Sequence, residues 1–343
     1  MCNIAGYVGS REAAPILIEM MKKQEGWGGG YYTGLATIDE DGKMQHAKIT
    51  GDTKRMLDYT DAANLRGTVG ILHSRSKSGG DDLWSHPFIG TGGKLAYVAN
   101  GAYGIFKDRS DERTEIFRML EDGGYHSRSR TVKQVGHYPT MPDGTSAHMS
   151  DIMAQYITKL IDDGYDASAA MDEAFCTMPS EIVGLSLYEY EPDCIIWSRI
   201  NQPMMIGFAD HGTYLATTAL AFPDDAKNIT MLPANSGGRA YFGMYTAKPY
   251  DFPPCTVSEI TPKVWHRAYE IVVNALNGGN ALTIGQLSNA VKPAFDEADC
   301  CQGAMLAYNI LHCLRDEGRL KVIESRVPGM RKTIDAPLLR ASL

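Results

Sequence analysis

Apolar and polar positions along the chain predict a succession of strands and helices that starts with a buried strand. Residues 2–9 (CNIAGYVG) form a short apolar run with two glycines. Residues 13–23 (AAPILIEMMKK) predict a helix, because proline is tolerated in the first turn, where Pro15 falls. Apolar stretches at 35–39 and 44–49 flank Asp41-Gly42, a strong signal for a hairpin.

The middle of the chain alternates between blocks of strands and blocks of helices. Buried strands are predicted at 67–75 and at 94–101, the second ending in Asn100-Gly101. The remaining predicted elements are helices at 112–120, 151–162 and 167–175, and strands at 182–188, 194–199, 204–208 and 213–217. This order predicts an α+β fold in which two antiparallel sheets stack and are covered by helices.

The pattern changes near residues 251–255 (DFPPC), where we expect a domain boundary. Beyond it, helices are predicted at 262–276, 283–290 and 302–316, followed by strands at 320–325 and 330–334 around Pro328-Gly329. Three helices and a two-stranded wing are the outline of a winged helix-turn-helix. The predicted domains are therefore residues 1–255 and a winged-helix-like domain at residues 256–343.

Composition narrows the function classes. Of the 343 residues, 44% are hydrophobic and 22% are charged, which is ordinary for a globular protein in water. The net charge of −8 argues against a surface that coats nucleic acid. No apolar run of membrane-spanning length and no signal peptide is present, so we expect no membrane partner. The seven cysteines have no zinc spacing, and we expect reduced thiols, a cytoplasmic location, and neither metal nor cofactor.

Cys2 is the most informative position for chemistry. If Met1 is removed, Cys2 carries a thiol and a free α-amine on one residue. Their ordinary pKa values lie near 8.5 and 8, so both are poised for proton transfer about neutral pH. An N-terminal amine can act as the base for its own side chain. From its position alone, Cys2 is interpreted equally well as a small apolar residue in a buried strand.

Several short motifs, in order and behind Cys2, together carry a family resemblance. They are Cys2-Asn-Ile-Ala-Gly, Thr33-Gly-Leu-Ala, Gly70-Ile-Leu-His-Ser-Arg75, Ser85-His-Pro and Ala99-Asn-Gly101. Residues 2 to about 250 resemble the glutaminase domain of class II glutamine amidotransferases, a branch of the N-terminal-nucleophile hydrolases. Within that class the likeness is to glucosamine-6-phosphate synthase. The resemblance implies a four-layer αββα sandwich that hydrolyses L-glutamine.

The resemblance also implies roles for individual residues. Cys2 Sγ would attack the carboxamide carbon while the Cys2 α-amine shuttles the proton. Asn100 and the Gly101 N–H would form the oxyanion hole, in which one donor is typically worth ~3 kcal/mol. Arg75 would bind the glutamine α-carboxylate through its planar fork, with Ser78 as a further donor. His73 and His86 occupy family-like positions, and we interpret both as structural.

The sequence departs from the family pattern at positions that bind the substrate and gate ammonia. The resemblance puts Met149 where the family has an aspartate for the glutamine α-amine, and Asp151 lies two residues later. Asp151 is a candidate for that role, although an acidic residue in a first helical turn is common for other reasons. Ser76, Gly79 and Gly28 replace a tryptophan, a histidine and an arginine of the family. Another amide as substrate therefore remains an alternative.

The chain lacks the rest of a synthase, which shapes the expected partners. About 90 residues follow position 255, too few for sugar-phosphate isomerase domains. We therefore expect a separate ammonia-acceptor subunit. Residues 262–343 carry ten Lys/Arg and eight Asp/Glu, so we favour protein docking over DNA binding. The alternatives are an amidase for another amide, and a non-catalytic glutamine sensor that regulates transcription.

Overall fold

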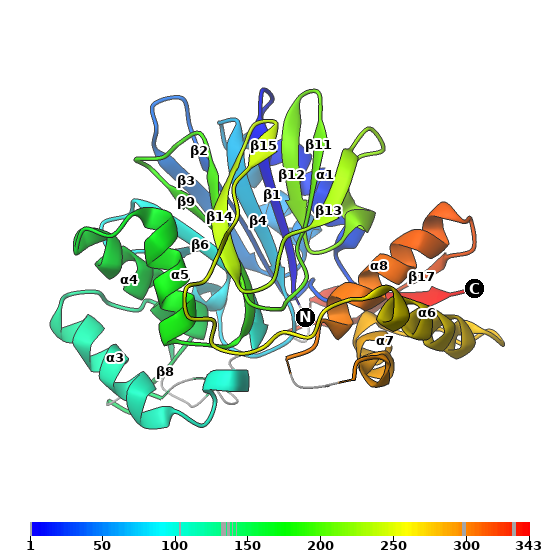
Figure 1. Ribbon diagram of the computed structural model, residues 1–343. Coiled ribbons are helices and arrows are strands. Elements are labelled where there is room, and N and C mark those ends of the chain that lie inside the picture. The colour runs from blue at the N-terminus through cyan, green and yellow to red at the C-terminus, as the bar shows by residue number, and fades with distance from the viewer. Residues whose placement is uncertain are drawn as a thin grey trace.

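The computed structural model describes residues 2–102, 104–131, 135, 138, 140–141, 143–296, 300–330 and 334–343. Within them, two antiparallel sheets form the centre of the molecule (Figure 1). The first sheet has the strand order β13-β11-β12-β1-β4-β2-β3. Its strands are β1 (Asn3–Gly9), β2 (Tyr32–Ile38), β3 (Met44–Thr50), β4 (Val69–Arg75), β11 (Met205–Ala209), β12 (Gly212–Ala216) and β13 (Lys227–Met231).

The second sheet has the order β15-β14-β10-β9-β6-β5, with β16 paired to β14. Its strands are β5 (Phe88–Ile89), β6 (Leu95–Ala102), β9 (Glu181–Tyr188), β10 (Ile195–Arg199), β14 (Ser236–Tyr241), β15 (Met244–Tyr245) and β16 (Lys248–Pro249). A separate short pair is formed by β7 (Arg130–Thr131) and β8 (Ser146–Ala147).

The alternation of side chains along β1 explains the layering. Ile4 and Val8 point into a core shared with Val98 and Leu185 of the second sheet. Tyr7, on the opposite face, packs in another core with α1 (Ala13–Gln24). Because successive strand residues face opposite sides, the first sheet is buried on both faces. The prediction of an α+β fold with two antiparallel sheets is therefore confirmed.

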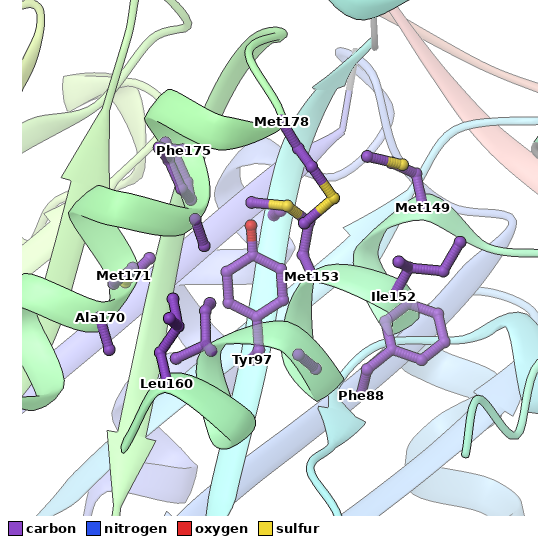
Figure 2. Close-up of a cluster of buried hydrophobic side chains, with 14 of the residues drawn as sticks. Phe88, Tyr97, Met149, Ile152, Met153, Leu160, Ala170, Met171, Phe175 and Met178 are labelled. Atoms are coloured by element: carbon purple, nitrogen blue, oxygen red, sulfur yellow. The ribbon is translucent and has the colours of Figure 1, made fainter. Parts of the chain in front are cut away.

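Helices α4 (Met149–Asp162) and α5 (Ala167–Thr177) cover the outer face of the second sheet. Figure 2 shows their apolar side chains around Tyr97 of β6, with Met153, Met171 and Phe175 among them. Two further helices, α2 (Thr53–Tyr59) and α3 (Ser110–Asp122), lie at the periphery. This packing fixes the start of α4, where Met149 lies, relative to the end of β6.

The C-terminal segment (residues 256–343) supplies most of a further hydrophobic core. It contains α6 (Pro262–Leu276), α7 (Ile284–Ala290), α8 (Gly303–Asp316) and the hairpin β17 (Lys321–Pro328) and β18 (Asp335–Ser342). Trp27 and Leu220 of the sandwich contribute to this core, so the two parts pack directly together. Figure 1 shows the start of β1 at the junction between the sheets and the C-terminal helices.

Most predicted elements agree with the structure, and the exceptions have physical reasons. The second C-terminal strand is β18 (Asp335–Ser342) instead of residues 330–334, of which 331–333 lie outside the described residues. The predictions missed α2, β13 and β14. The β14 sequence SGGRAY has little apolar alternation, and pairing with β10 makes it a strand. No helix among the described residues is long and apolar enough to cross a membrane.

Candidate active site

The thiol of Cys2 lies buried at the junction of the two sheets. Pairing of Asn3 with Ser74 brings Cys2 beside the end of β4. There the Ser76 N–H donates to Cys2 Sγ at 3.5 Å, and Ser76 Oγ lies 3.6 Å from the same sulfur. Burial raises the pKa of the Cys2 thiol, but the neighbouring His73 imidazole, the positive charge of the amino terminus and the Ser76 N–H together lower it more, to about 6. At neutral pH the thiol is therefore available as a thiolate, the nucleophilic form.

Asn100 and Gly101, from β6 of the second sheet, line the same cavity as Cys2. The Cys2 backbone N–H donates to Asn100 Oδ1 at 2.9 Å, whereas Asn100 Nδ2 is buried without a hydrogen-bond partner. Gly101 has φ +152°, and a Cβ there would lie 2.0 Å from the Glu181 carbonyl oxygen. An unpaired, buried donor is costly unless it has a task. This donor is suited to a developing oxyanion.

Arg75 ends β4 and is fully buried. Its Nε donates to Ser78 Oγ at 2.8 Å, and its terminal nitrogens donate to the carbonyl oxygens of Gly79 and Trp84. The guanidinium carbon lies 4.0 Å from the centre of the Tyr32 ring. A guanidinium has five N–H donors, so two remain beyond these three bonds. Ser78 thus positions Arg75, and both residues line the cavity at Cys2.

A cluster of histidines forms one wall. The rings of His73 and His86 lie 3.8 Å apart, and His148 lies 5.2 Å from His86. The His73 Nε2–H donates to the Ala99 carbonyl oxygen at 2.8 Å, because a carbonyl only accepts. Burial holds the pKa values of His86 and His148 well below the ordinary range. These two rings are therefore neutral and supply shape and polarity.

The cavity next to Cys2, here called the nucleophile cavity, has a volume of about 370 Å³. Predicted residues Cys2, Arg75, Ser78, Asn100 and Gly101 all line it. None of its described lining residues is acidic. The other described lining residues are Ser76, His86, Ala99, Tyr138, His148, Met149, Ser150, Ser180, Ile182 and Gln202.

Asp151 lies outside this lining. Its Oδ2 accepts the backbone N–H groups of Arg128 and Ser129, both at 2.7 Å, and its Oδ1 accepts Gln155 Nε2 at 3.2 Å. The carboxylate therefore anchors the loop before α4 instead of facing the cavity. Met149 faces the nucleophile cavity in its place, at the edge of the cluster in Figure 2.

Sequence reasoning missed three residues at the site. Gln202 and His148 line the cavity, and Tyr308 of α8, which is outside the described lining, lies close to Asn3 and Cys2. The Tyr308 hydroxyl is fully buried without a hydrogen-bond partner. Burial raises the pKa of Tyr308. The nearby Asn3 amide lowers this pKa by less, and the Cys2 thiol raises it slightly. No local sequence signal identifies these contacts, because each depends on packing between distant segments.

Comparison with curated proteins places the chain in a family. It is 22% identical over 310 residues to glutamine–fructose-6-phosphate aminotransferase [isomerizing] of Bacteroides thetaiotaomicron, covering 89% of this chain and 44% of the relative. It is 26% identical over 234 residues to the protein of that name from Leifsonia xyli, covering 66% of this chain and 33% of the relative. The chain contains a class II glutamine amidotransferase domain. It spans less than half the length of these relatives, and the relationship is distant.

Solved structures support the fold of this amidotransferase domain. The glutamine phosphoribosylpyrophosphate amidotransferase from B. subtilis, complexed with ADP and GMP, superposes with a TM-score of 0.59 at 15% identity, covering 96% of this chain and 68% of that one. The structure of the allosteric regulatory enzyme of purine biosynthesis gives a TM-score of 0.60 at 14% identity, covering 97% of this chain and 67% of that one. No protein-family model matches the chain.

Proposed function

We propose that this amidotransferase domain hydrolyses the side-chain amide of L-glutamine through a thioester on Cys2. The observation that carries the proposal is the arrangement of Asn100, whose Oδ1 accepts the Cys2 N–H while its buried Nδ2 has no partner. One amide thereby orients the nucleophilic residue and keeps a free donor on the same side chain. Arg75, with donors to spare, lines the same cavity and is suited to a substrate carboxylate.

The proposed chemistry needs no group beyond the chain, glutamine and water. Cys2 Sγ bonds to the amide carbon, and Asn100 Nδ2 and the Gly101 N–H stabilise the oxyanion. The C–N bond then breaks, and ammonia leaves with a proton delivered by the Cys2 α-amine. Water attacks the thioester, releases glutamate and restores the thiol. The amine is free only after Met1 is removed, and Met1 lies outside the described residues.

Glutamate release from L-glutamine by the processed protein tests this proposal. Because no other thiol supplies a nucleophile at this position, Cys2→Ala is expected to lower kcat by at least ~1,000-fold. Cys176→Ala is the matched control, since burial raises the pKa of that thiol to about 11 and it lies outside the cavity. A Cys2→Ala protein that retains activity, or an inactive processed parent, would overturn the proposal.

A second candidate is hydrolysis of another carboxylate-bearing amide. The observation in its favour is that Met149 faces the cavity while Asp151 binds the Arg128 and Ser129 backbone. Glutamine would then lack a carboxylate partner for its α-ammonium among the described lining residues. Comparing kcat/KM for L-glutamine with that for N-acetyl-L-glutamine and glutaramate separates the two candidates. A Met149→Asp variant that gains preference for L-glutamine would support the same explanation.

The C-terminal segment is proposed as a separate, winged-helix-like domain that begins near residue 256 and docks the ammonia acceptor in the cytoplasm. A hydrophobic core built mostly from its own residues supports this division. Val322 and Ile323 of β17 are exposed apolar residues on its surface. Pull-down from the native cell with the full chain and with Val322→Ser/Ile323→Ser tests the docking role. Recovery of the same enzyme by both proteins would contradict it.

A further inference from the structure

A second cavity lies between the sandwich and the C-terminal segment and has no role in the proposed chemistry. We call it the junction cavity. Its volume is about 420 Å³, slightly larger than the nucleophile cavity. Its walls come from the glycine-rich stretch 26–29, the loop after β10, and the C-terminal segment around α7 and the start of α8. Trp27 and Tyr31 provide its aromatic surface.

Asn201 gives the first sign that this cavity binds something. Its side chain is 1% exposed and lines the junction cavity. Both Oδ1 and Nδ2 are buried without a hydrogen-bond partner. A buried amide with neither end paired is rare in proteins and costs free energy. A ligand that presents both a donor and an acceptor would remove that cost.

The wall that carries Asn201 is held rigidly. Arg199 is fully buried, and it donates to the Gln202 carbonyl oxygen at 2.6 Å and to the Asn201 carbonyl oxygen at 3.2 Å. The same guanidinium donates to the side chain of Gln302, the residue that precedes α8. The unpaired amide is therefore part of a fixed surface that both parts of the molecule build.

Two opposite charges complete the junction cavity. Lys292 and Glu181 both line it, and neither has an ion pair or a side-chain hydrogen bond among the described residues. Both lie close to the Cys301 thiol, where burial raises the pKa, Lys292 lowers it and Glu181 raises it. An unpaired cation and an unpaired carboxylate that share one cavity are complementary to a zwitterion.

We propose that the junction cavity binds a free α-amino acid with a polar side chain. Its α-carboxylate pairs with Lys292, and its α-ammonium pairs with Glu181. Its polar side chain forms hydrogen bonds with the unpaired amide of Asn201. The cavity volume of about 420 Å³ is within the range of small-molecule sites. The aromatic surface of Trp27 and Tyr31 contacts the aliphatic part of the ligand.

The junction cavity is connected to the nucleophile in two ways. Gln202 lines both cavities. The N–H groups of Gly28 and Gly29, in the wall of the junction cavity, donate to Asn3 Oδ1 at 3.3 and 2.8 Å, and Asn3 follows Cys2 directly. A bound amino acid therefore changes the rate at Cys2. The binding claim is independent of the proposed glutaminase activity, whereas this effect on rate rests on it.

Calorimetric titration of the full-length Cys2→Ala protein tests the binding claim, because no substrate turns over. The probes are L-glutamine, L-glutamate and L-asparagine. Lys292→Met and Glu181→Gln are each expected to weaken binding of a probe at least tenfold. The matched controls are Lys263→Met and Glu259→Gln, exposed residues outside the cavity, which leave binding unchanged. Because Lys292 is exposed, its substitution is compatible with folding.

The outcomes separate the two sites and the two claims. N-acetyl-L-glutamine, which lacks the ammonium group, is expected to lose Lys292-dependent binding. The proposal is overturned if no probe binds at millimolar concentration, or if either charge variant binds all three probes as tightly as the parent. In the processed wild-type protein, added L-asparagine, which is neither substrate nor product of the proposed reaction, changes the rate of glutamate release. Lys292→Met removes that change. An inactive parent with Lys292-dependent binding would contradict only the proposed glutaminase.

Discussion

The nucleophile cavity and the junction cavity share one wall but differ in how their polar groups are used. In the nucleophile cavity Arg75 is bound by Ser78 and two carbonyl groups, and Asn100 Oδ1 is paired with Cys2. In the junction cavity Lys292, Glu181 and the whole amide of Asn201 have no partner among the described residues. Groups that are already oriented favour chemistry, whereas groups left unpaired favour binding.

Asn100 and Asn201 make this comparison concrete. Each is a buried asparagine whose Nδ2 has no partner. Asn100 keeps its other end on the backbone of the nucleophile, so its free donor has a defined direction. Asn201 has neither end fixed by a hydrogen bond. The same residue type therefore supports two different roles, and substitution at each position separates them.

Among the substitutions that test this comparison, Asn100→Ala has the largest expected effect. Loss of one oxyanion donor is expected to lower kcat by about 100- to 1,000-fold with a smaller change in KM. Steady-state measurement of glutamate release checks this result. The control is Asn64→Ala, because Asn64 is exposed and lines neither cavity. A variant at Asn100 with raised KM and normal kcat would assign the residue to substrate binding instead.

Glu25 directly precedes the glycine-rich wall of the junction cavity, is buried, and accepts hydrogen bonds from Ser74 and Thr53. Burial raises the pKa of Glu25 to about 7. The hydrogen bond from Ser74 lowers this pKa, and the nearby charge of Asp52 raises it further. The folded state therefore binds this proton more tightly than the unfolded state. The protonated carboxyl therefore adds at most roughly 3 kcal/mol to the free energy of unfolding. This contribution is complete below about pH 4.5 and is lost as the pH rises through about 7.

Glu25→Gln is expected to remove this contribution. Denaturant unfolding at pH 5 and pH 8 measures it, and the difference in unfolding free energy between the two pH values should shrink in the variant. Asp172, whose pKa burial also raises to about 7, supplies a remaining slope of the same sign. Glu40→Gln, at an exposed glutamate, is the matched control. An unchanged pH difference in Glu25→Gln would show that this carboxylate does not couple folding to pH.

A smaller effect is expected in the pH profile of the nucleophile. With a Cys2 pKa of about 6, the thiolate fraction falls about tenfold between pH 7 and pH 5, and kcat/KM should follow it. Because the His73 imidazole lowers that pKa, His73→Gln should move the acid limb to higher pH. His46→Gln, on an exposed position of β3, should leave the limb in place. A limb unmoved by His73→Gln would exclude His73 as the cause.

The smallest effect is expected at the edge of the junction between the two parts. Arg326 Nη2 of β17 lies 2.7 Å from Asp52 Oδ2, and the arginine side chain is 52% exposed. Because exposed ion pairs contribute little, Arg326→Met should lower the unfolding free energy by less than about 1 kcal/mol. Arg118→Met is the matched exposed control. A loss of several kcal/mol would mean that this pair holds the C-terminal segment in place.

Short motifs, and the family resemblance that they carry, predicted the parts of the nucleophile cavity that depend on local order along the chain. Cys2, Arg75 and Asn100-Gly101 each mark the end of a strand, and strand ends at one edge of a sandwich come together. Asp151 is different, because a first-turn carboxylate can serve a loop or a ligand. Its hydrogen bonds with the backbone of Arg128 and Ser129 form only because the loop before α4 folds back onto the start of that helix.

The junction cavity could not be predicted in this way. Asn201 is unremarkable in sequence, and its unpaired amide is evident only when β10, α7 and α8 are packed together. Tyr308 likewise reaches the nucleophile only because α8 packs against the start of β1. Groups that meet across two packed parts of a chain carry no periodic signal. Their roles follow from burial and missing partners instead.

Rapid-quench peptide mass spectrometry after mixing the purified protein with L-glutamine tests the central claim most directly. The account predicts that the first peptide begins at Cys2 and carries a transient γ-glutamyl group on that residue. A first peptide that begins at Met1, or a processed peptide that never carries the adduct while glutamate accumulates, would contradict it.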